Sequence, residues 1–152
     1  MVINLEISTP EKMTELGYVL CNNCKGGEVF ILSSDLGGGK TTLVRGMARA
    51  IGEEESISSP SFTLQNTYSG KVMTIEHFDF YRLDDPGIMM YELEEAMQGT
   101  NTIVVVEWPG IVLDSLPHDS IVVTITQSEN SLRNVSIETD PTHEYVLEGV
   151  RA

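Results

Sequence analysis

The sequence predicts an α/β fold, a three-layer α/β/α sandwich whose mostly parallel central sheet carries antiparallel hairpin additions. Two short, apolar and β-prone runs, 28–32 and 102–109, are typical of strands that are covered on both faces. The first run leads through a glycine-rich turn into residues 43–51, whose apolar positions have helical spacing. The 152 residues contain no internal repeat, so we expect one domain spanning 1–152.

The segments on either side of the glycine-rich turn follow the same pattern. Residues 2–7 are expected to form a strand. Thr9 is a suitable N-cap and Pro10 a suitable first residue for a helix over 10–22. The helix that follows the turn is predicted to end at Gly52, since glycine favours the left-handed conformation at a helix C-terminus.

Two antiparallel pairs and one more helix are predicted in the rest of the chain. A strand that continues from 58–64 through Tyr68 turns at Ser69-Gly70 and returns over 71–80. Residues 120–126 and 132–138 alternate between apolar and polar, which predicts a terminal hairpin. The helix is predicted to begin at Pro86, with Asp84 or Asp85 as its cap and with these apolar positions: Ile88, Tyr91, Leu93, Ala96 and Met97.

Composition and charge exclude several classes of protein. The net charge is −14, from 23 acidic and 9 basic residues, so a broad basic face for binding nucleic acid is not expected. No apolar run approaches the ~20 residues of a membrane span, and the N-terminus lacks the pattern of a signal peptide. We therefore expect a cytoplasmic protein that does not contact a membrane.

Cys21 and Cys24 form an isolated C-x-x-C motif. A zinc site needs four ligands, and no second Cys or His pair stands at the required spacing. Redox motifs usually lie at a helix N-terminus, whereas these cysteines fall near the predicted C-terminus of a helix. Two reduced structural cysteines are the expected outcome.

Residues 33–42, Ser-Ser-Asp-Leu-Gly-Gly-Gly-Lys-Thr-Thr, have the composition and the strand-turn-helix context of a P-loop. Glycines let backbone N–H groups converge on phosphate oxygens, and the helix N-terminus favours negative charge. Lys40 is expected to reach the β- and γ-phosphates, and Thr41 to bind Mg²⁺. The expected nucleotide contacts of the loop are Asp35, Leu36, Gly37, Gly38, Gly39, Lys40, Thr41 and Thr42. Ser34 replaces the first glycine of the usual pattern and would strain the loop if it required a positive φ.

Two acidic residues follow predicted strands. Glu107 ends the Val-rich run, and ligands bind at the carboxyl ends of strands in open α/β sheets, so Glu107 is a candidate Mg²⁺ ligand. Asp79 is a second candidate for the site, where it would hold Mg²⁺ through water or orient the attacking water. The alternative is a structural aspartate that pairs with Arg82. His77 is interpreted as a core or rim histidine. Trp108 packs against a nucleotide base or a partner, or closes the core.

Four sequence blocks occur in an order and at a spacing that resemble the TsaE family, formerly YjeE, of bacterial tRNA N6-threonylcarbamoyladenosine biosynthesis. The blocks are 36–46, 59–64, 77–83 and 106–109. The resemblance covers essentially the full length and implies a P-loop NTPase-type fold that binds ATP and Mg²⁺. It departs from the family at Ser34 and over 86–98, where the family usually has a glycine-containing loop.

The resemblance also implies partners and residue roles. It implies an ATPase that works with TsaB and TsaD and meets tRNA only through that complex, where hydrolysis resets the complex between turnovers. Lys40, Asp79 and Glu107 are its implied catalytic residues, with Thr41 and Glu107 serving the metal. Further implied contacts with the nucleotide are Thr9, Trp108 and Arg133.

Two alternatives to this function stay open. One is a nucleotide-responsive binding module with negligible turnover alone, and the other is a small P-loop kinase. A kinase usually needs several arginines to clamp two phosphorylated substrates, and only Arg133 and Arg151 follow Arg82. A GTPase is disfavoured because the sequence has no Asn-Lys-x-Asp motif.

Overall fold

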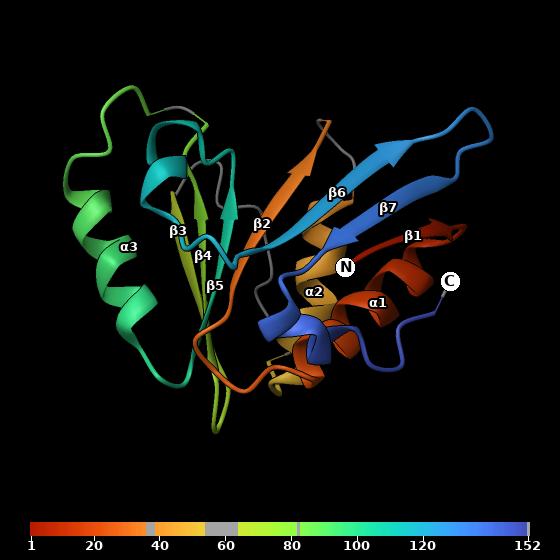
Figure 1. The fold of residues 1–152 in the computed structure, drawn as a ribbon, viewed down its shortest axis with the longest axis horizontal. Coiled ribbons are helices and arrows are strands. Elements are labelled where there is room, and N and C mark those ends of the chain that lie inside the picture. Colours follow the sequence, from red (N-terminus) through yellow and green to blue (C-terminus); the bar gives the residue numbers. More distant parts are fainter. Residues whose placement is uncertain (36–38, 54–63, 82, 152) are drawn as a thin grey trace.

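A seven-stranded sheet organises the computed structural model, which describes residues 1–35, 39–53, 64–81 and 83–151. Strands and helices alternate along the chain except for two consecutive strand pairs, and helices lie on both sides of the sheet (Figure 1). The elements are β1 (Val2–Ile7), α1 (Pro10–Asn22), β2 (Val29–Ser34), α2 (Lys40–Ala50), β3 (Gln65–Ser69), β4 (Thr74–Asp79), α3 (Ile88–Gln98), β5 (Thr102–Glu107), the 3₁₀ helix η1 (Gly110–Ser115), β6 (Ile121–Gln127), β7 (Arg133–Glu138) and the 3₁₀ helix η2 (Pro141–Leu147).

The strand order is β1-β7-β6-β2-β5-β4-β3, with four parallel strands at the centre. β2 pairs in parallel with β5 and β6, and β4 pairs in parallel with β5. The antiparallel pairs are β3 with β4, β6 with β7, and β1 with β7. The predicted sandwich with antiparallel additions is therefore confirmed. The predicted terminal hairpin is also part of the main sheet, because β6 pairs with β2.

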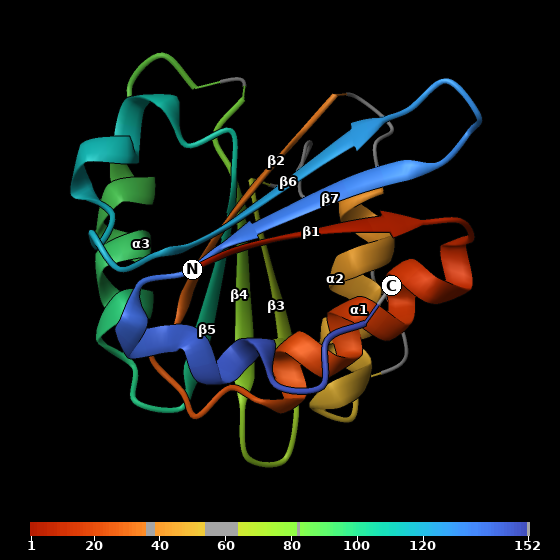
Figure 2. The same cartoon turned by 45° about the vertical axis from the view of Figure 1, so that its right-hand side comes forward.

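Two hydrophobic clusters pack on opposite faces of the sheet. Phe30 and Leu32 of β2 pack with α1 and α2, whereas Val29 of the same strand packs with Leu93 of α3. This alternation follows from the two-residue side-chain period of a strand. Figure 2 shows α1, α2 and η2 together on one face and α3 on the other. Residues 77 and 79 of β4 and 107 of β5 alternate onto the face of the sheet that α2 covers.

The helix before the P-loop has the predicted bounds, 10–22, and Thr9 is its N-cap. The Thr9 hydroxyl accepts a hydrogen bond from the N–H of Lys12, at 3.1 Å. Gly52 follows α2 with a φ of +93°, as the predicted C-terminal stop requires. The hairpin of β3 and β4 is also confirmed, although β4 begins at Thr74 because residues 70–73 form the turn.

The predicted cap of α3 is wrong. The helix begins at Ile88 after Gly87, whose φ is +50°, and no side chain caps it. Asp85 instead accepts a hydrogen bond from the N–H of Gly87, at 3.0 Å, which stabilises the turn before the helix. Of the apolar positions expected on this helix, Leu93 is buried, while Ile88 and Tyr91 are exposed.

Candidate functional site

Asp79 and Glu107 lie side by side at the carboxyl ends of neighbouring strands. The parallel register of β4 and β5 pairs them directly, and both side chains are 2% exposed. They share a face of the sheet with Ile75 and Val105, which pack in the cluster under α2. Sequence reasoning placed each residue at a strand end, and the register brings them together.

Lys40 joins this pair as the first residue of α2. Its Nζ lies 3.5 Å from Oε1 of Glu107, and the side chain is 8% exposed. A carboxylate so deeply buried needs a compensating charge, which the ammonium group supplies. The P-loop lysine and the predicted metal ligand are thus in direct contact.

Trp108 contacts Lys40 through the face of its indole ring. The Lys40 Nζ lies 4.7 Å from the ring centroid, a cation–π distance, and the Tyr81 ring packs on Trp108 at 4.9 Å. The backbone of Trp108 has a φ of +51°, which is strained for a bulky residue and costs on the order of 1–3 kcal/mol. This conformation turns the chain sharply after Glu107 and aims the ring at the lysine.

His77 also contacts Glu107, a contact that the sequence did not predict. Its Nε2 lies 2.5 Å from Oε2 of Glu107, and its side chain is fully buried. His77 is buried, as the interpretation of a core histidine requires, but that interpretation did not include a polar contact. The only local signal was a histidine between Ile75 and Asp79, at positions that alternate onto one face of β4.

The described part of the P-loop is compatible with phosphate binding. Gly39 immediately precedes α2 and has a φ of +106°, a backbone conformation that residues other than glycine rarely adopt. Ser34 ends β2, pairs with Ile125, and does not have a positive φ. The strain that Ser34 could have introduced is therefore absent at this residue. Asp35 follows it on the surface, and its carbonyl accepts a 2.8 Å hydrogen bond from the Ser34 hydroxyl.

Several predicted residues lie outside the described ones. Leu36, Gly37 and Gly38 of the loop belong to this group, as does Arg82, so the alternative pairing of Asp79 with Arg82 is not described. The hydroxyl-rich segment 59–63 lies outside them as well. Thr41 is half-buried in the first turn of α2, next to Lys40 in the chain.

A cavity of about 230 Å³ opens beside the start of α2. It brings Thr9 and Arg133, from the ends of β1 and β7, together with Gly39 and Thr42 of the P-loop segment. The antiparallel register explains this, since Ile7 pairs with Arg133. Its lining is completed by Ile7, Ser8, Pro10, Met13 and Ser131. These five residues were not predicted as site residues, and Ser8, Met13 and Ser131 stand in no recognisable motif.

Oxygen ligands and a cation fit a site for Mg²⁺ and a nucleotide. Magnesium is usually bound by one or two carboxylates together with phosphate oxygens and water, and Glu107 and Asp79 provide such carboxylates. Among the described residues, no group of three or more His, Cys, Asp and Glu side chains could hold a metal alone. The arrangement therefore suits a metal that arrives with phosphates better than a permanent metal centre.

The two cysteines are free and buried or half-buried, as expected for structural residues. Burial, reinforced by the negative charge of Glu28, raises the pKa of the Cys21 thiol from 9.0 to about 12. The same causes raise the pKa of Cys24. Both thiols therefore stay protonated near neutral pH, and neither is an activated nucleophile.

Comparison with known proteins identifies the family. The family model "Threonylcarbamoyl adenosine biosynthesis protein TsaE" matches residues 7–135. The tRNA threonylcarbamoyladenosine biosynthesis protein TsaE of Rickettsia conorii is 35% identical over 137 residues, which cover 88% of this chain and 77% of that protein. The protein of the same name from Rickettsia felis is 32% identical over 151 residues, 97% of this chain and 86% of that protein.

A solved structure supports the fold. The crystal structure of YdiB from Bacillus subtilis matches with a TM-score of 0.77 at 24% sequence identity, covering 97% of this chain and 93% of that one. Across the described residues, no helix is long and apolar enough to cross a membrane. The family match spans the P-loop segment and both strands that carry the acidic pair. This chain belongs to the TsaE family of threonylcarbamoyl adenosine biosynthesis proteins.

Proposed function

We propose that this chain is a single-domain, cytoplasmic P-loop ATPase required for forming N6-threonylcarbamoyladenosine in tRNA. The contact of Lys40 with Glu107 at the start of α2 is the observation that carries the proposal. It joins the phosphate-binding lysine to a buried carboxylate at a strand end, where P-loop proteins hold the metal of a nucleoside triphosphate. Membership of the TsaE family supports the link to tRNA modification.

The described residues divide the site into two parts. Lys40, Asp79 and Glu107, together with Thr41, would form the phosphate and metal end, and the cavity with Thr9 and Arg133 would form the other end. Gly39 and Lys40 are adjacent in the chain, so the two ends meet at the N-terminus of α2. Bound Mg²⁺ would neutralise part of the phosphate charge. Lys40 would bind the β- and γ-phosphates, and Thr41 and Glu107 would hold the metal.

Trp108 has a role in this arrangement that differs from packing on a nucleotide base. Its ring lies over the Lys40 ammonium group and would limit the positions that this side chain can take. An aromatic face attracts the cation without forming a hydrogen bond, so the lysine keeps its donors for phosphate oxygens. Trp108 is therefore proposed to orient Lys40.

Replacing Glu107 with alanine tests the metal role. We expect Mg²⁺-dependent ATP hydrolysis to fall by at least about 100-fold, while nucleotide binding measured in EDTA falls much less. Hydrolysis is followed by phosphate release and binding by a fluorescent ATP analogue. Glu138→Ala, which removes an exposed carboxylate from β7, is the matched control and should change neither quantity. Equal losses of hydrolysis and Mg²⁺-free binding would indicate a structural role for Glu107 instead.

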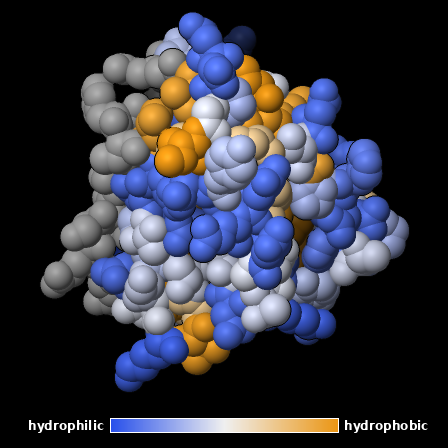
Figure 3. Space-filling view, turned by 90° about the vertical axis from the view of Figure 1, so that its left-hand side faces the viewer, coloured by the Kyte–Doolittle hydropathy of each residue, from blue (hydrophilic) through white to orange (hydrophobic). Residues whose placement is uncertain are grey.

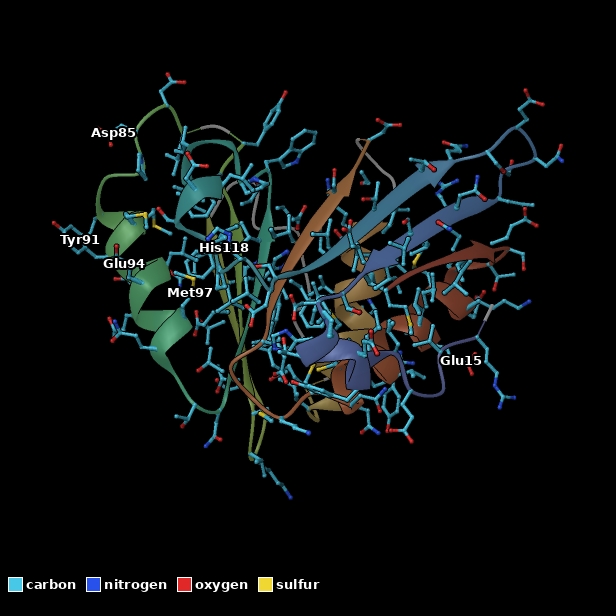
Figure 4. The ribbon with its side chains drawn as sticks, in the orientation of Figure 1. Glu15, Asp85, Tyr91, Glu94, Met97 and His118 are labelled. Atoms are coloured by element: carbon cyan, nitrogen blue, oxygen red, sulfur yellow. The ribbon has the colours of Figure 1, made fainter. Side chains whose placement is uncertain are left out.

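The proposed partners are TsaB and TsaD, which would contact the tRNA in place of this acidic chain. With a net charge of −14, the chain is poorly suited to bind RNA directly. One face of α3 is suited to contact a protein, because Ile88 and Tyr91 are 73% and 72% exposed and lie three residues apart. Tyr91 points away from the sheet (Figure 4), and hydrophobic residues gather near one end of this side of the molecule (Figure 3).

Reconstitution tests the function as a whole. We expect the purified chain to restore threonylcarbamoyladenosine formation in a system that contains TsaB and TsaD but lacks this subunit. The modified nucleoside is measured by mass spectrometry of digested tRNA, and ATP hydrolysis is measured with and without the partners. Hydrolysis should be slow for the chain alone and faster in the complex. Restoration without any partner-stimulated hydrolysis would favour a nucleotide-responsive binding module, and no restoration by folded protein would refute the proposal.

A further inference from the structure

We propose that His77 is a positioning residue that holds one oxygen of Glu107, so that the other oxygen is directed toward the metal and phosphates. This inference rests on the proposed function, because it concerns the same carboxylate. His77 Nε2 lies 2.5 Å from Oε2 of Glu107, and Lys40 Nζ lies 3.5 Å from Oε1. Each oxygen therefore has a different partner, and the carboxylate has one orientation that satisfies both.

The position of His77 on β4 explains why only this side chain can make the contact. Ile75, His77 and Asp79 alternate onto the α2 face of the strand. In the parallel register His77 is opposite Val105, one side-chain step below the pair of Asp79 and Glu107. A long side chain at position 77 thus reaches diagonally upward to Glu107 from beneath. Asp79 is instead level with Glu107 and carries the same charge.

Apart from Asn66, which is opposite His77 on β3, and Asp79 on the same strand, the neighbours of His77 give little reason for a polar residue. Ile75 and Val105, its neighbours on this face, are fully buried core residues, and the Tyr68 ring centroid lies 6.2 Å from that of His77. A polar side chain in such a place is costly unless it forms a hydrogen bond. Among the described residues, Glu107 is the only hydrogen-bond partner of this ring, because Nδ1 is buried there without one.

The proton arrangement follows from these contacts. A hydrogen atom lies between Nε2 and the carboxylate oxygen in this contact, and because Nδ1 has no partner we assign Nε2 as the donor. Nδ1 then carries only a lone pair, so no N–H group is buried without an acceptor. Lys40 and Glu107 form an ion pair through Oε1, and the ring adds a hydrogen-bond donor to Oε2.

The hydrogen bond from His77 would matter most when Lys40 leaves Glu107 to bind a phosphate. Oε1 of Glu107 then loses its ammonium partner, whereas Oε2 keeps the hydrogen bond to His77. The hydrogen bond to His77 would restrict rotation of the carboxylate, so that Oε1 would stay available to a bound metal. Residues that orient metal ligands in this way typically contribute about 10- to 100-fold in metal affinity.

A pair of amide substitutions tests this role. The Nε2 of glutamine can occupy the position of the histidine Nε2, whereas the shorter asparagine cannot reach Glu107. We expect His77→Asn to raise the Mg²⁺ concentration for half-maximal binding of mant-ATP by about 10-fold or more. We expect His77→Gln to stay within about 3-fold of the unmodified protein. Affinity for mant-ATP in EDTA should be similar in all three proteins.

Controls separate positioning from packing. Ile75→Val removes a methyl group from the same strand and face. It should leave unchanged the Mg²⁺ concentration for half-maximal binding of mant-ATP, called the Mg²⁺ midpoint below. Thermal unfolding shows that each variant is folded before binding is measured. An unchanged Mg²⁺ midpoint in His77→Asn, or an equal shift in both amide variants, would overturn the positioning role alone. Binding by the unmodified protein that is the same with and without Mg²⁺ would overturn the proposed Mg·ATP site and the role of His77 together.

Discussion

Replacement of Lys40 by alanine is expected to reduce ATP hydrolysis by at least about 100-fold, to the background of the assay. Lys40 begins α2, and its ammonium group contacts Glu107 of the acidic pair at the strand ends. Its ammonium group would stabilise charge on the transferred phosphoryl group, beside two carboxylates that are buried. Phosphate release in the presence of TsaB and TsaD measures the effect under the most active conditions.

The Lys40 substitution also leaves Glu107 buried without its cation. Removing one partner of a buried ion pair costs about 3–5 kcal/mol, so loss of activity could reflect unfolding. Lys40→Arg keeps the positive charge, but its planar guanidinium group cannot replace a compact ammonium group at the phosphates. We expect this variant to stay folded in thermal denaturation and still lose most hydrolysis.

Arg49→Ala is the matched control for charge, since it removes an exposed cation from the last turn of the same helix. Hydrolysis by this variant should remain close to that of the unmodified chain. Full activity in Lys40→Ala, measured on folded protein, would contradict the assignment of residues 33–42 as a phosphate-binding loop.

The parts of the fold that the sequence predicted well have local signals. The helix over 10–22 has a cap, a proline at its first position and regular apolar spacing, and its bounds were predicted without error. Strand order has no such signal. Nothing local to 121–127 indicates that this strand lies between β2 and β7, because pairing depends on contacts between distant segments. The start of α3 was misplaced because Gly87 takes a positive φ that an Asp cap does not require.

The residues of the candidate site also differ in whether the local sequence predicts them. Lys40, Asp79 and Glu107 could be proposed because each follows a strand or a glycine-rich turn at a recognisable place. The contact of His77 with Glu107 spans 30 residues of sequence and depends on the register of β4 with β5, which no motif encodes. Thr9 and Arg133 were implied by resemblance to the family. The pairing of β1 with β7 is what brings them to the same cavity.

Replacement of Gly46 by alanine is expected to destabilise the chain by about 1–3 kcal/mol. This is expected although Gly46 lies within α2, where alanine has the higher helix propensity. A Cβ atom at Gly46 would lie 1.9 Å from the carbonyl oxygen of Thr14 in α1. The contact is reciprocal, since a Cβ at Gly17 of α1 would lie 2.0 Å from the carbonyl oxygen of Leu43 in α2. The two glycines let α1 and α2 approach at backbone distance, so a methyl group at either position must push the helices apart.

Two opposing effects decide the sign of this change. Alanine is favoured over glycine inside a helix by about 1 kcal/mol, which would stabilise the variant if space were available. Here the clash is with backbone atoms that cannot rotate away, so overpacking outweighs propensity. For a chain of this length, a net loss of about 2 kcal/mol lowers the unfolding temperature by roughly 4–8 °C.

The displacement should also reach the candidate site, because α1 carries Thr9 at its cap and Met13 in its second turn, both of which line the cavity. We therefore expect weaker nucleotide binding in Gly46→Ala at temperatures where the variant is fully folded. Gly110→Ala is the matched control, since a Cβ there meets no atom within 4 Å, and its unfolding temperature should not fall. A Gly46→Ala variant that unfolds at a higher temperature than the unmodified chain would show that propensity prevails and that the helices can separate at little cost.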